Sequence, residues 1–199
     1  PTAERVNITR IIALTERAAV IVKQLLKLAR KPTEKEQHTV SLLNVINETL
    51  EMGASKIRYD NVNLEINITD QSLLVHGDSH RLISVFQNLI NNSFDEFQRM
   101  DQSSGRQPHI TIGLDESACN DHEVTILFKD NAGGIPAHII QNVFDPFFTT
   151  KDVGSGTGLG LTLVRNIMDE LGGSISVRSE GVETTFSIRL KREKSLESD

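Results

Sequence analysis

Residues 130–136 read DNAGGIP and combine an acidic residue with two glycines, which have no side chain to cover the backbone. They follow VTILFK, which alternates apolar and polar residues like a half-buried strand. Asp130 therefore stands where a strand is expected to end, beside two glycines that let another group approach the main chain closely. A carboxylate in that place can accept hydrogen bonds from a ligand, although the stretch is equally typical of a strand-ending turn.

A second stretch, GSGTGLGL, places glycines at positions 154, 156, 158 and 160, directly before an apolar helical pattern. The amides of such a loop can turn toward an anion, and the helix adds its positive N-terminal end. The stretch lacks the Lys-Ser/Thr ending of a P-loop and the spacing of G-x-G-x-x-G. It predicts a phosphate-binding loop of another kind, with a flexible linker as the alternative.

Two further stretches carry polar groups among apolar ones. In QNLINNSFDEF, the side chains of Asn88, Asn92 and Asp95 recur at intervals of four and three, so they share one helix face. In FDPFFTTK, three aromatic residues surround a proline and are followed by Thr149, Thr150 and Lys151. A solvated stripe and a set of core aromatics are the simpler interpretations of these two patterns when each is taken alone.

The rest of the chain predicts the elements that must position these residues. The order of helices and strands indicates an α+β domain with a sheet layer and a helix layer, and without internal repeats. Asp78 is expected to cap the second of its helices. Helices are predicted over 40–53, 79–100, a short segment opened by Pro136, and 159–173; strands are predicted over 62–68, 73–77, 109–114, 124–129, 174–179 and 184–190.

The first 31 residues differ from the rest in charge and pattern. They hold seven Lys/Arg and two acids, a net charge of +5, which leaves −11 on the remaining 168 residues. An acidic domain of this kind is a poor nucleic-acid binder. A long helix is predicted up to Pro32, and its apolar seam must pack against other helices, from a second copy or from outside this sequence. The seam consists of Ile11, Leu14, Ala18, Ile21, Leu25 and Leu28.

Composition excludes several classes of protein. No run of about 18 apolar residues and no basic-then-apolar leader is present, so we expect no membrane contact by this segment. The single cysteine, Cys119, excludes a disulfide framework and fits a reducing, cytoplasmic compartment. His76 and His80 are separated by a predicted turn, which favours solvated histidines over a metal pair.

Together and in this order, the four chemical stretches resemble the ATP-binding catalytic domain of sensor histidine kinases. NLINNS resembles its N box, DNAGGI its first glycine box, FDPFFTTK its F box and GSGTGLGL its second glycine box. This domain is similar to ATPases of heat-shock chaperones, MutL-type repair proteins and type II topoisomerases. The first 31 residues resemble the second helix of the dimerisation and phosphoacceptor hairpin that precedes the domain.

The resemblance implies a Bergerat ATP-binding fold, a two-layer α/β sandwich with a mixed sheet and helices on one face, preceded by one long helix. It also implies a division of the chain. Residues 1–31 would be the hairpin helix, 32–39 a linker, 40–191 the catalytic domain and 192–199 a tail.

The resemblance also implies ATP and Mg²⁺ as cofactors. Asp130 would accept the exocyclic amino proton of adenine, Gly134 would leave space for the purine face, and Asn92 would offer its amide oxygen to Mg²⁺. Lys151 would reach the terminal phosphate, and a lid between Phe144 and Gly158 should be mobile without nucleotide. The complete expected site is Asn88, Asn92, Asp95, Asp130, Gly134, Ile135, Lys151, Gly156, Thr157, Gly158, Leu159 and Gly160.

Four positions depart from the family pattern. Asp95 stands where many members have a basic residue, and the acid resembles the nitrogen-regulation branch, which argues against direct phosphate contact by residue 95. Ser93 replaces an alanine and Ala132 a glycine. Glu183 replaces the glycine before TTF, which weakens the case for a base contact by Thr184.

The resemblance favours a phosphotransferase over two alternatives. The γ-phosphoryl group of ATP would pass to a histidine on an upstream helix, in cis or in trans, and then to an aspartate of a response-regulator receiver domain, with the kinase as a homodimer. No catalytic residue is assigned within this sequence, and a membrane anchor elsewhere in the parent protein is compatible with it. A conformational ATPase would need a carboxylate where Asn88 stands, and a regulatory nucleotide-binding module is the other alternative.

Overall fold

The computed structural model describes residues 38–100, 105–152 and 156–193, together with the isolated positions 15, 18, 19 and 22. Apart from these four positions, the predicted first helix and its seam lie outside the described residues, as do residues 32–37 of the predicted linker. Gly154 and the last six residues of the chain also lie outside them.

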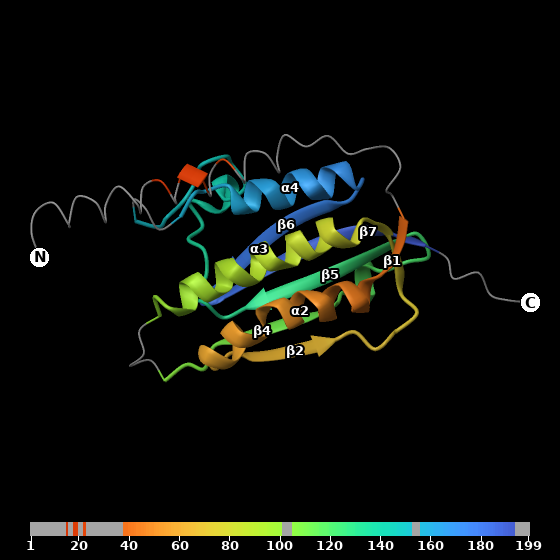
Figure 1. Cartoon of the computed structure of the whole chain (residues 1–199), viewed down its shortest axis with the longest axis horizontal. Helices are drawn as coiled ribbons and strands as arrows, with labels where there is room; N and C mark the ends of the chain where they lie inside the picture. The colour runs from red at the N-terminus through yellow and green to blue at the C-terminus, as the bar shows by residue number, and fades with distance from the viewer. Residues whose placement is uncertain are drawn as a thin grey trace, which may run out of the picture.

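The described part is built on a seven-stranded sheet in the order β1-β3-β7-β5-β4-β2, with β6 also paired to β7 (Figure 1). Strand β2 runs parallel to β4, and every other pair is antiparallel, so the sheet is mixed as expected. The strands are β1 (His38–Ser41), β2 (Asn63–Asn67), β3 (Leu74–Gly77), β4 (His109–Leu114), β5 (Glu123–Asp130), β6 (Ser174–Glu180) and β7 (Glu183–Glu193).

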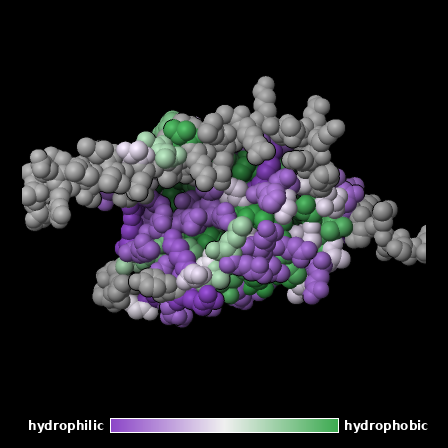
Figure 2. Space-filling model, viewed as in Figure 1, coloured by the Kyte–Doolittle hydropathy of each residue, from purple (hydrophilic) through white to green (hydrophobic). Residues whose placement is uncertain are grey.

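Three helices, α2 (Leu42–Tyr59), α3 (Ser79–Phe97) and α4 (Gly160–Glu170), lie in front of the sheet in Figure 1. Helix α3 lies between the other two and packs against both. This arrangement confirms the predicted two-layer α+β fold. Where described atoms are visible, hydrophilic side chains cover most of this face and hydrophobic ones form smaller separate patches (Figure 2). Within the described ranges, no helix is long and apolar enough to cross a membrane.

The core lies between the helices and one face of the central strands. Alternate residues of β5, namely Val124, Ile126 and Phe128, are buried on this face because side chains in a strand alternate between its two sides. The same alternation places Asp130 on the buried face, at the end of the apolar row. The fold therefore carries a carboxylate into the edge of its core.

Helix α3 starts where the sequence predicts. The Asp78 carboxylate accepts a hydrogen bond from the Arg81 amide at 2.8 Å, which satisfies one of the free amides of the first turn. The apolar face of the helix is buried, while Asn88, Asn92 and Asp95 lie partly exposed beside it. The buried apolar residues are Leu82, Ile83, Val85, Phe86, Leu89, Ile90, Phe94 and Phe97.

Three features differ from the sequence-based expectation. Helix α2 continues to Tyr59, where Lys56 and Arg58 occupy a last turn that favours positive charge. Strand β1 was not predicted, because it has only four residues and is defined by its pairing with distant β3. The short helix predicted from Pro136 starts later: the chain forms a turn from Pro136 to Ile139, and a 3-10 helix follows at Ile140–Asn142.

The cap of α3 is testable because this helix also carries site residues. Replacing Asp78 with alanine removes the acceptor for the Arg81 amide, so Asp78→Ala should lower the free energy of unfolding by about 1 kcal/mol in urea titrations. Asp78→Asn keeps a capping oxygen and is the matched control. Equal stabilities for the alanine and asparagine variants would show that the cap contributes nothing.

Candidate functional site

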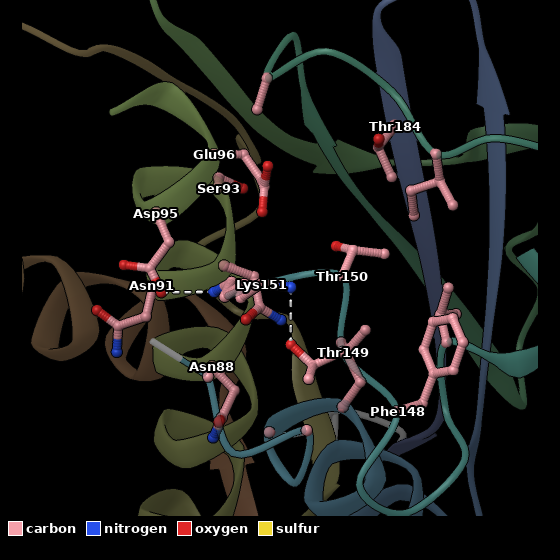
Figure 3. A pocket seen from close by; sticks show the side chains of 18 of the residues that line it. Asn88, Asn91, Ser93, Asp95, Glu96, Phe148, Thr149, Thr150, Lys151 and Thr184 are labelled. Carbon is pink, nitrogen blue, oxygen red and sulfur yellow. Dashed lines mark hydrogen bonds and ion pairs between the residues drawn. The ribbon is translucent and has the colours of Figure 1, made fainter. Parts of the chain in front are cut away.

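A cavity of about 790 Å³ opens between α3, the end of β5 and residues 148–151 and 156–161. Polar side chains of α3 line one wall and Phe148, Thr149, Thr150 and Lys151 face them, while Thr184 comes from β7 (Figure 3). The expected site residues converge here, since Asn88, Asn92, Asp95, Asp130, Gly134, Ile135, Lys151, Gly156, Thr157, Gly158 and Gly160 all line the cavity. Leu159 is the exception, because its side chain is buried and is not part of the lining.

The Asp130 carboxylate lies at the deep end of this cavity and is only 7% exposed. It accepts hydrogen bonds from the Ser93 hydroxyl at 2.8 Å and from the Ala132 amide at 3.0 Å. Burial raises its pKa above the ordinary 3.8, and the nearby Glu96 acts in the same direction, while the two hydrogen bonds oppose the shift. The result is a buried acceptor held in a fixed orientation.

Two residues around Asp130 are more closely associated with its side chain than the sequence indicated. Ser93, expected to be a mild replacement, is buried and is a direct partner of Asp130. Thr184 is 4% exposed and lies opposite Asp130 in the β5–β7 register. The register between these two strands cannot be predicted from the sequence, so the proximity of Asp130 and Thr184 was not expected. The departure at Glu183 does not remove Thr184 from the cavity wall.

Backbone packing fixes the loop after Asp130. The Asn131 side chain accepts from the His109 amide and donates to the Gln107 carbonyl, both at 2.9 Å, which ties the end of β5 to the start of β4. Gly134 has a φ of +77°, and a Cβ there would lie 2.2 Å from the Gly181 carbonyl oxygen. Glycine is therefore required for close contact with the β6–β7 turn, while the space it would leave for a purine stays a prediction.

Two amide side chains of α3 converge near the start of α4. A Cβ placed on Gly160 would lie 3.0 Å from the Asn88 Oδ1 and 4.0 Å from the Asn92 Oδ1, so both oxygens face the start of α4. The Asn88 amide nitrogen donates to the Ser84 carbonyl at 2.7 Å, which leaves its oxygen directed toward the site. Amide oxygens are hard ligands that suit Mg²⁺. In the described ranges no cluster of three or more His, Cys, Asp or Glu side chains could hold a metal.

Phe147, near the start of the lid expected between Phe144 and Gly158, contacts the residue at its end. The Phe147 amide donates to the Gly158 carbonyl at 3.0 Å, and both residues have positive φ angles, +65° and +66°. A Cβ on Gly158 would lie 2.4 Å from the Phe147 carbonyl carbon, so only glycine allows this contact. Residues 153–155 between these ends lie outside the described residues, and the mobility of the lid stays a prediction.

The charged pair in the cavity wall was not expected from the sequence. The Lys151 ammonium lies 2.6 Å from the Asp95 carboxylate (Figure 3). The same carboxylate is 3.8 Å from the Lys56 ammonium. Lys151 thus comes to the wall that carries Asn88 and Asn92, as expected for a phosphate-binding cation. In this structure its partner is a carboxylate of α3.

The raised pKa of Asp130 predicts a pH-dependent stability. A carboxyl group whose pKa is higher in the folded state stabilises the fold only while protonated, and this contribution is lost as pH rises from 3.8 through the raised value. We expect Asp130→Asn to be at least as stable as the parent in urea at pH 7, with the difference shrinking toward pH 4. Asp121→Asn, at an exposed aspartate, should show no such trend. A neutral-pH loss of more than about 1 kcal/mol would contradict the prediction.

Comparison with known families identifies this arrangement. The family model described as histidine kinase-, DNA gyrase B-, and HSP90-like ATPase matches residues 77–194, which is more than half of the chain. The matched range contains the Asp130 loop, the polar face of α3 and both ends of the glycine-rich loop.

Curated relatives are sensor kinases. Sensor histidine kinase ZraS of Escherichia coli is 33% identical over 171 residues, covering 85% of this chain and 34% of ZraS. The C4-dicarboxylate transport sensor protein DctB of Pseudomonas aeruginosa is 31% identical over 173 residues, covering 87% of this chain and 27% of DctB. The chain thus spans only a minor part of the length of these relatives.

Solved structures agree with the fold. The nucleotide-free catalytic domain of histidine kinase ThkA matches with a TM-score of 0.65 and 26% identity, over 79% of this chain and 98% of that domain. ThkA in complex with response regulator protein TrrA matches with a TM-score of 0.69 at 24% identity, over 97% of this chain and 52% of ThkA, which shows the fold alone. By its family match, its fold and the residues brought together in its cavity, the chain belongs to the histidine kinase-, DNA gyrase B- and HSP90-like ATPases.

Proposed function

We propose that this chain is the ATP-binding catalytic core of a two-component sensor histidine kinase. The observation that carries the proposal is the single cavity that joins a buried carboxylate at one end to amide oxygens, a lysine and a glycine-rich loop at the other. A nucleotide triphosphate needs both ends, because its base is selected by hydrogen bonds and its phosphates by cations and backbone amides. The sensor-kinase names of the relatives support the same activity.

At the deep end, the Asp130 carboxylate accepts a hydrogen bond from the exocyclic amino group of adenine. A carboxylate already oriented by Ser93 and the Ala132 amide does not have to reorganise when the base arrives. Thr184 lies next to it and supplies a hydroxyl that can donate or accept. A base that carries a carbonyl oxygen in place of the amino group would place one hydrogen-bond acceptor against another, the carboxylate. Adenine is therefore preferred.

At the shallow end, Asn92 and Asn88 direct amide oxygens toward the space where the phosphates would lie. These oxygens suit Mg²⁺ bound jointly with phosphates, and the ion when bound neutralises charge on the transferring group. Asn92 is the proposed ligand. Gly156, Gly158 and Gly160 line the adjacent wall, where backbone amides and the start of α4 favour an anion.

The chemistry that these residues support is phosphoryl transfer. The bond between the γ-phosphorus and the β,γ-bridging oxygen breaks, a bond to a histidine ring nitrogen forms, and ADP remains in the cavity. Catalysis then consists mainly of positioning and charge stabilisation. Asn88 stands where hydrolytic relatives carry a glutamate, and an amide cannot accept a proton from water, so transfer is favoured over a conformational ATPase.

The acceptor histidine is proposed to lie on a helical hairpin whose second helix resembles residues 1–31, acting in cis or in trans. From there the phosphoryl group would pass to an aspartate of a response-regulator receiver domain. ThkA was solved with such a regulator, which supports this class of partner. A homodimer, a cytoplasmic location and membership of the nitrogen-regulation branch belong to the same proposal.

The decisive experiment supplies the acceptor separately. The chain is incubated with γ-labelled ATP, Mg²⁺ and a purified hairpin that carries the acceptor histidine. We expect acid-labile phosphate on the hairpin and none on the chain itself. Release of free phosphate without labelling would instead indicate a conformational ATPase. Nucleotide binding with neither outcome would indicate a regulatory module.

Nucleotide affinity tests the role of Asp130. Asp130→Asn should weaken ADP binding by about 1.5 to 3 kcal/mol, the range for a hydrogen bond that involves a charged group, as measured by calorimetry. Asp121→Asn removes an exposed aspartate outside the cavity and is the matched control. Unchanged ADP affinity in the Asp130 variant would remove this residue from the base site.

Metal dependence tests the role of Asn92. Asn92→Ala should abolish Mg²⁺-dependent transfer to the hairpin while ADP binding in the absence of Mg²⁺ stays within about threefold of the parent, because base and metal contacts lie at opposite ends. Gln87→Ala is the control on the same helix, since that side chain bonds Met52 outside the cavity. Transfer at the parent rate by the Asn92 variant would place the metal ligand elsewhere.

A further inference from the structure

The Asp95 carboxylate has cationic partners from two different segments. The Lys151 ammonium lies 2.6 Å from its Oδ2, and the Lys56 ammonium lies 3.8 Å from its Oδ1. Asp95 belongs to α3, Lys56 to the last turn of α2, and Lys151 to the loop on the other side of the cavity. One oxygen of the carboxylate therefore faces a cation inside the cavity, and the other faces a cation outside it.

The two lysines differ in their access to a ligand. Lys151 lines the cavity, and its side chain is only 14% exposed. Lys56 is 38% exposed, does not line the cavity, and holds its ammonium 4.9 Å above the Phe94 ring. A cation over an aromatic face has a second favourable contact there. Only Lys151 is therefore placed to exchange its partner for a phosphate.

The main chain around Lys151 is restrained, so an exchange of partner requires movement of the side chain alone. The Lys151 amide donates to the Thr149 hydroxyl at 3.1 Å. Gly156 packs so closely that a Cβ on it would lie 2.9 Å from the Lys151 Cδ. The long, flexible side chain can move its ammonium by torsion alone.

We propose that Asp95 holds Lys151 in the absence of nucleotide and competes with the terminal phosphate of a bound triphosphate for the lysine ammonium. This inference rests on the proposed function and deepens it, because it makes Asp95 a positioning residue that sets the affinity for triphosphate relative to diphosphate. When the terminal phosphate takes Lys151, Lys56 remains beside Asp95. The carboxylate then keeps a counter-ion next to the incoming negative charge.

Two other mechanisms would involve the same residues. Asp95 could repel phosphate by its charge alone, without releasing Lys151. Alternatively, Asp95 could aim Lys151 at the phosphate and stay paired with it. The three mechanisms differ in the energetic coupling between positions 95 and 151, which is zero for simple repulsion and has opposite signs for the other two. A double-mutant cycle measures this coupling directly.

The experiment compares the parent, Asp95→Asn, Lys151→Met and the double variant by calorimetry with ADP and with a β,γ-imido ATP analogue. Lys151→Met should weaken binding of the analogue about fivefold or more and change ADP binding less than twofold. Asp95→Asn should strengthen binding of the analogue. This gain should be about fivefold larger with lysine than with methionine at 151, since a partly exposed ion pair contributes up to ~1 kcal/mol.

Each other result overturns the proposal. Equal gains in both backgrounds would mean simple repulsion, and a loss of affinity in the lysine background would mean that Asp95 aims Lys151. Glu96→Gln is the matched control, because Glu96 lines the same cavity but pairs with Arg99 at 3.3 Å, so its effect should not depend on residue 151. ADP binding without coupling refutes only the exchange, whereas a parent chain that binds no nucleotide refutes the proposed function as well.

Discussion

The site depends on one constraint, which is the burial of the Asp130 carboxylate at the edge of the core. Strand alternation places this side chain in line with Phe128, so it cannot turn to solvent without breaking the sheet. An ionised group in such a place requires hydrogen bonds, and Ser93 and the Ala132 amide supply them. The hydrogen bonds to this one carboxylate therefore hold three parts of the fold together: β5, the loop after it and α3. That arrangement leaves an acceptor prepared for a ligand before the ligand binds.

Helix α3 links the two ends of the cavity because a helix repeats its faces every three to four residues. Ser93 reaches Asp130 from the buried side of this helix, while Asn88 and Asn92 direct amide oxygens toward the start of α4. The polar and apolar stripes of one helix thus serve binding and packing together. Helices α2 and α4 flank it, and α2 contributes Lys56, which forms an ion pair with Asp95. The position of these polar side chains is consequently set by helix packing as well as by the loops.

Glycine acts in this site mainly through close backbone contact. Gly134 lies against the turn at Gly181, and Gly158 lies against Phe147, in both cases too near for any side chain. These contacts hold the base-side loop to the β6–β7 hairpin and join the two ends of the segment that carries Lys151. In the function proposed above, the amide of Asn88 favours phosphoryl transfer over hydrolysis, because it cannot accept a proton from water.

The sequence alone determined the features that are local in the chain: the periodic helices and strands, the cap at Asp78, and the grouping of polar residues into four short stretches. Those stretches were sufficient to find most of the cavity wall, because residues of one turn or one helix face stay together however the chain folds. Contacts between stretches were decided by tertiary structure. Lys151 and Asp95 are 56 residues apart, and Thr184 meets Asp130 only through the register of β5 and β7. Strand β1 likewise exists through its pairing with β3, and the short helix predicted from Pro136 begins only at Ile140, as a 3-10 helix. Register and packing result from burial summed over the whole domain, and no short stretch of sequence contains that information.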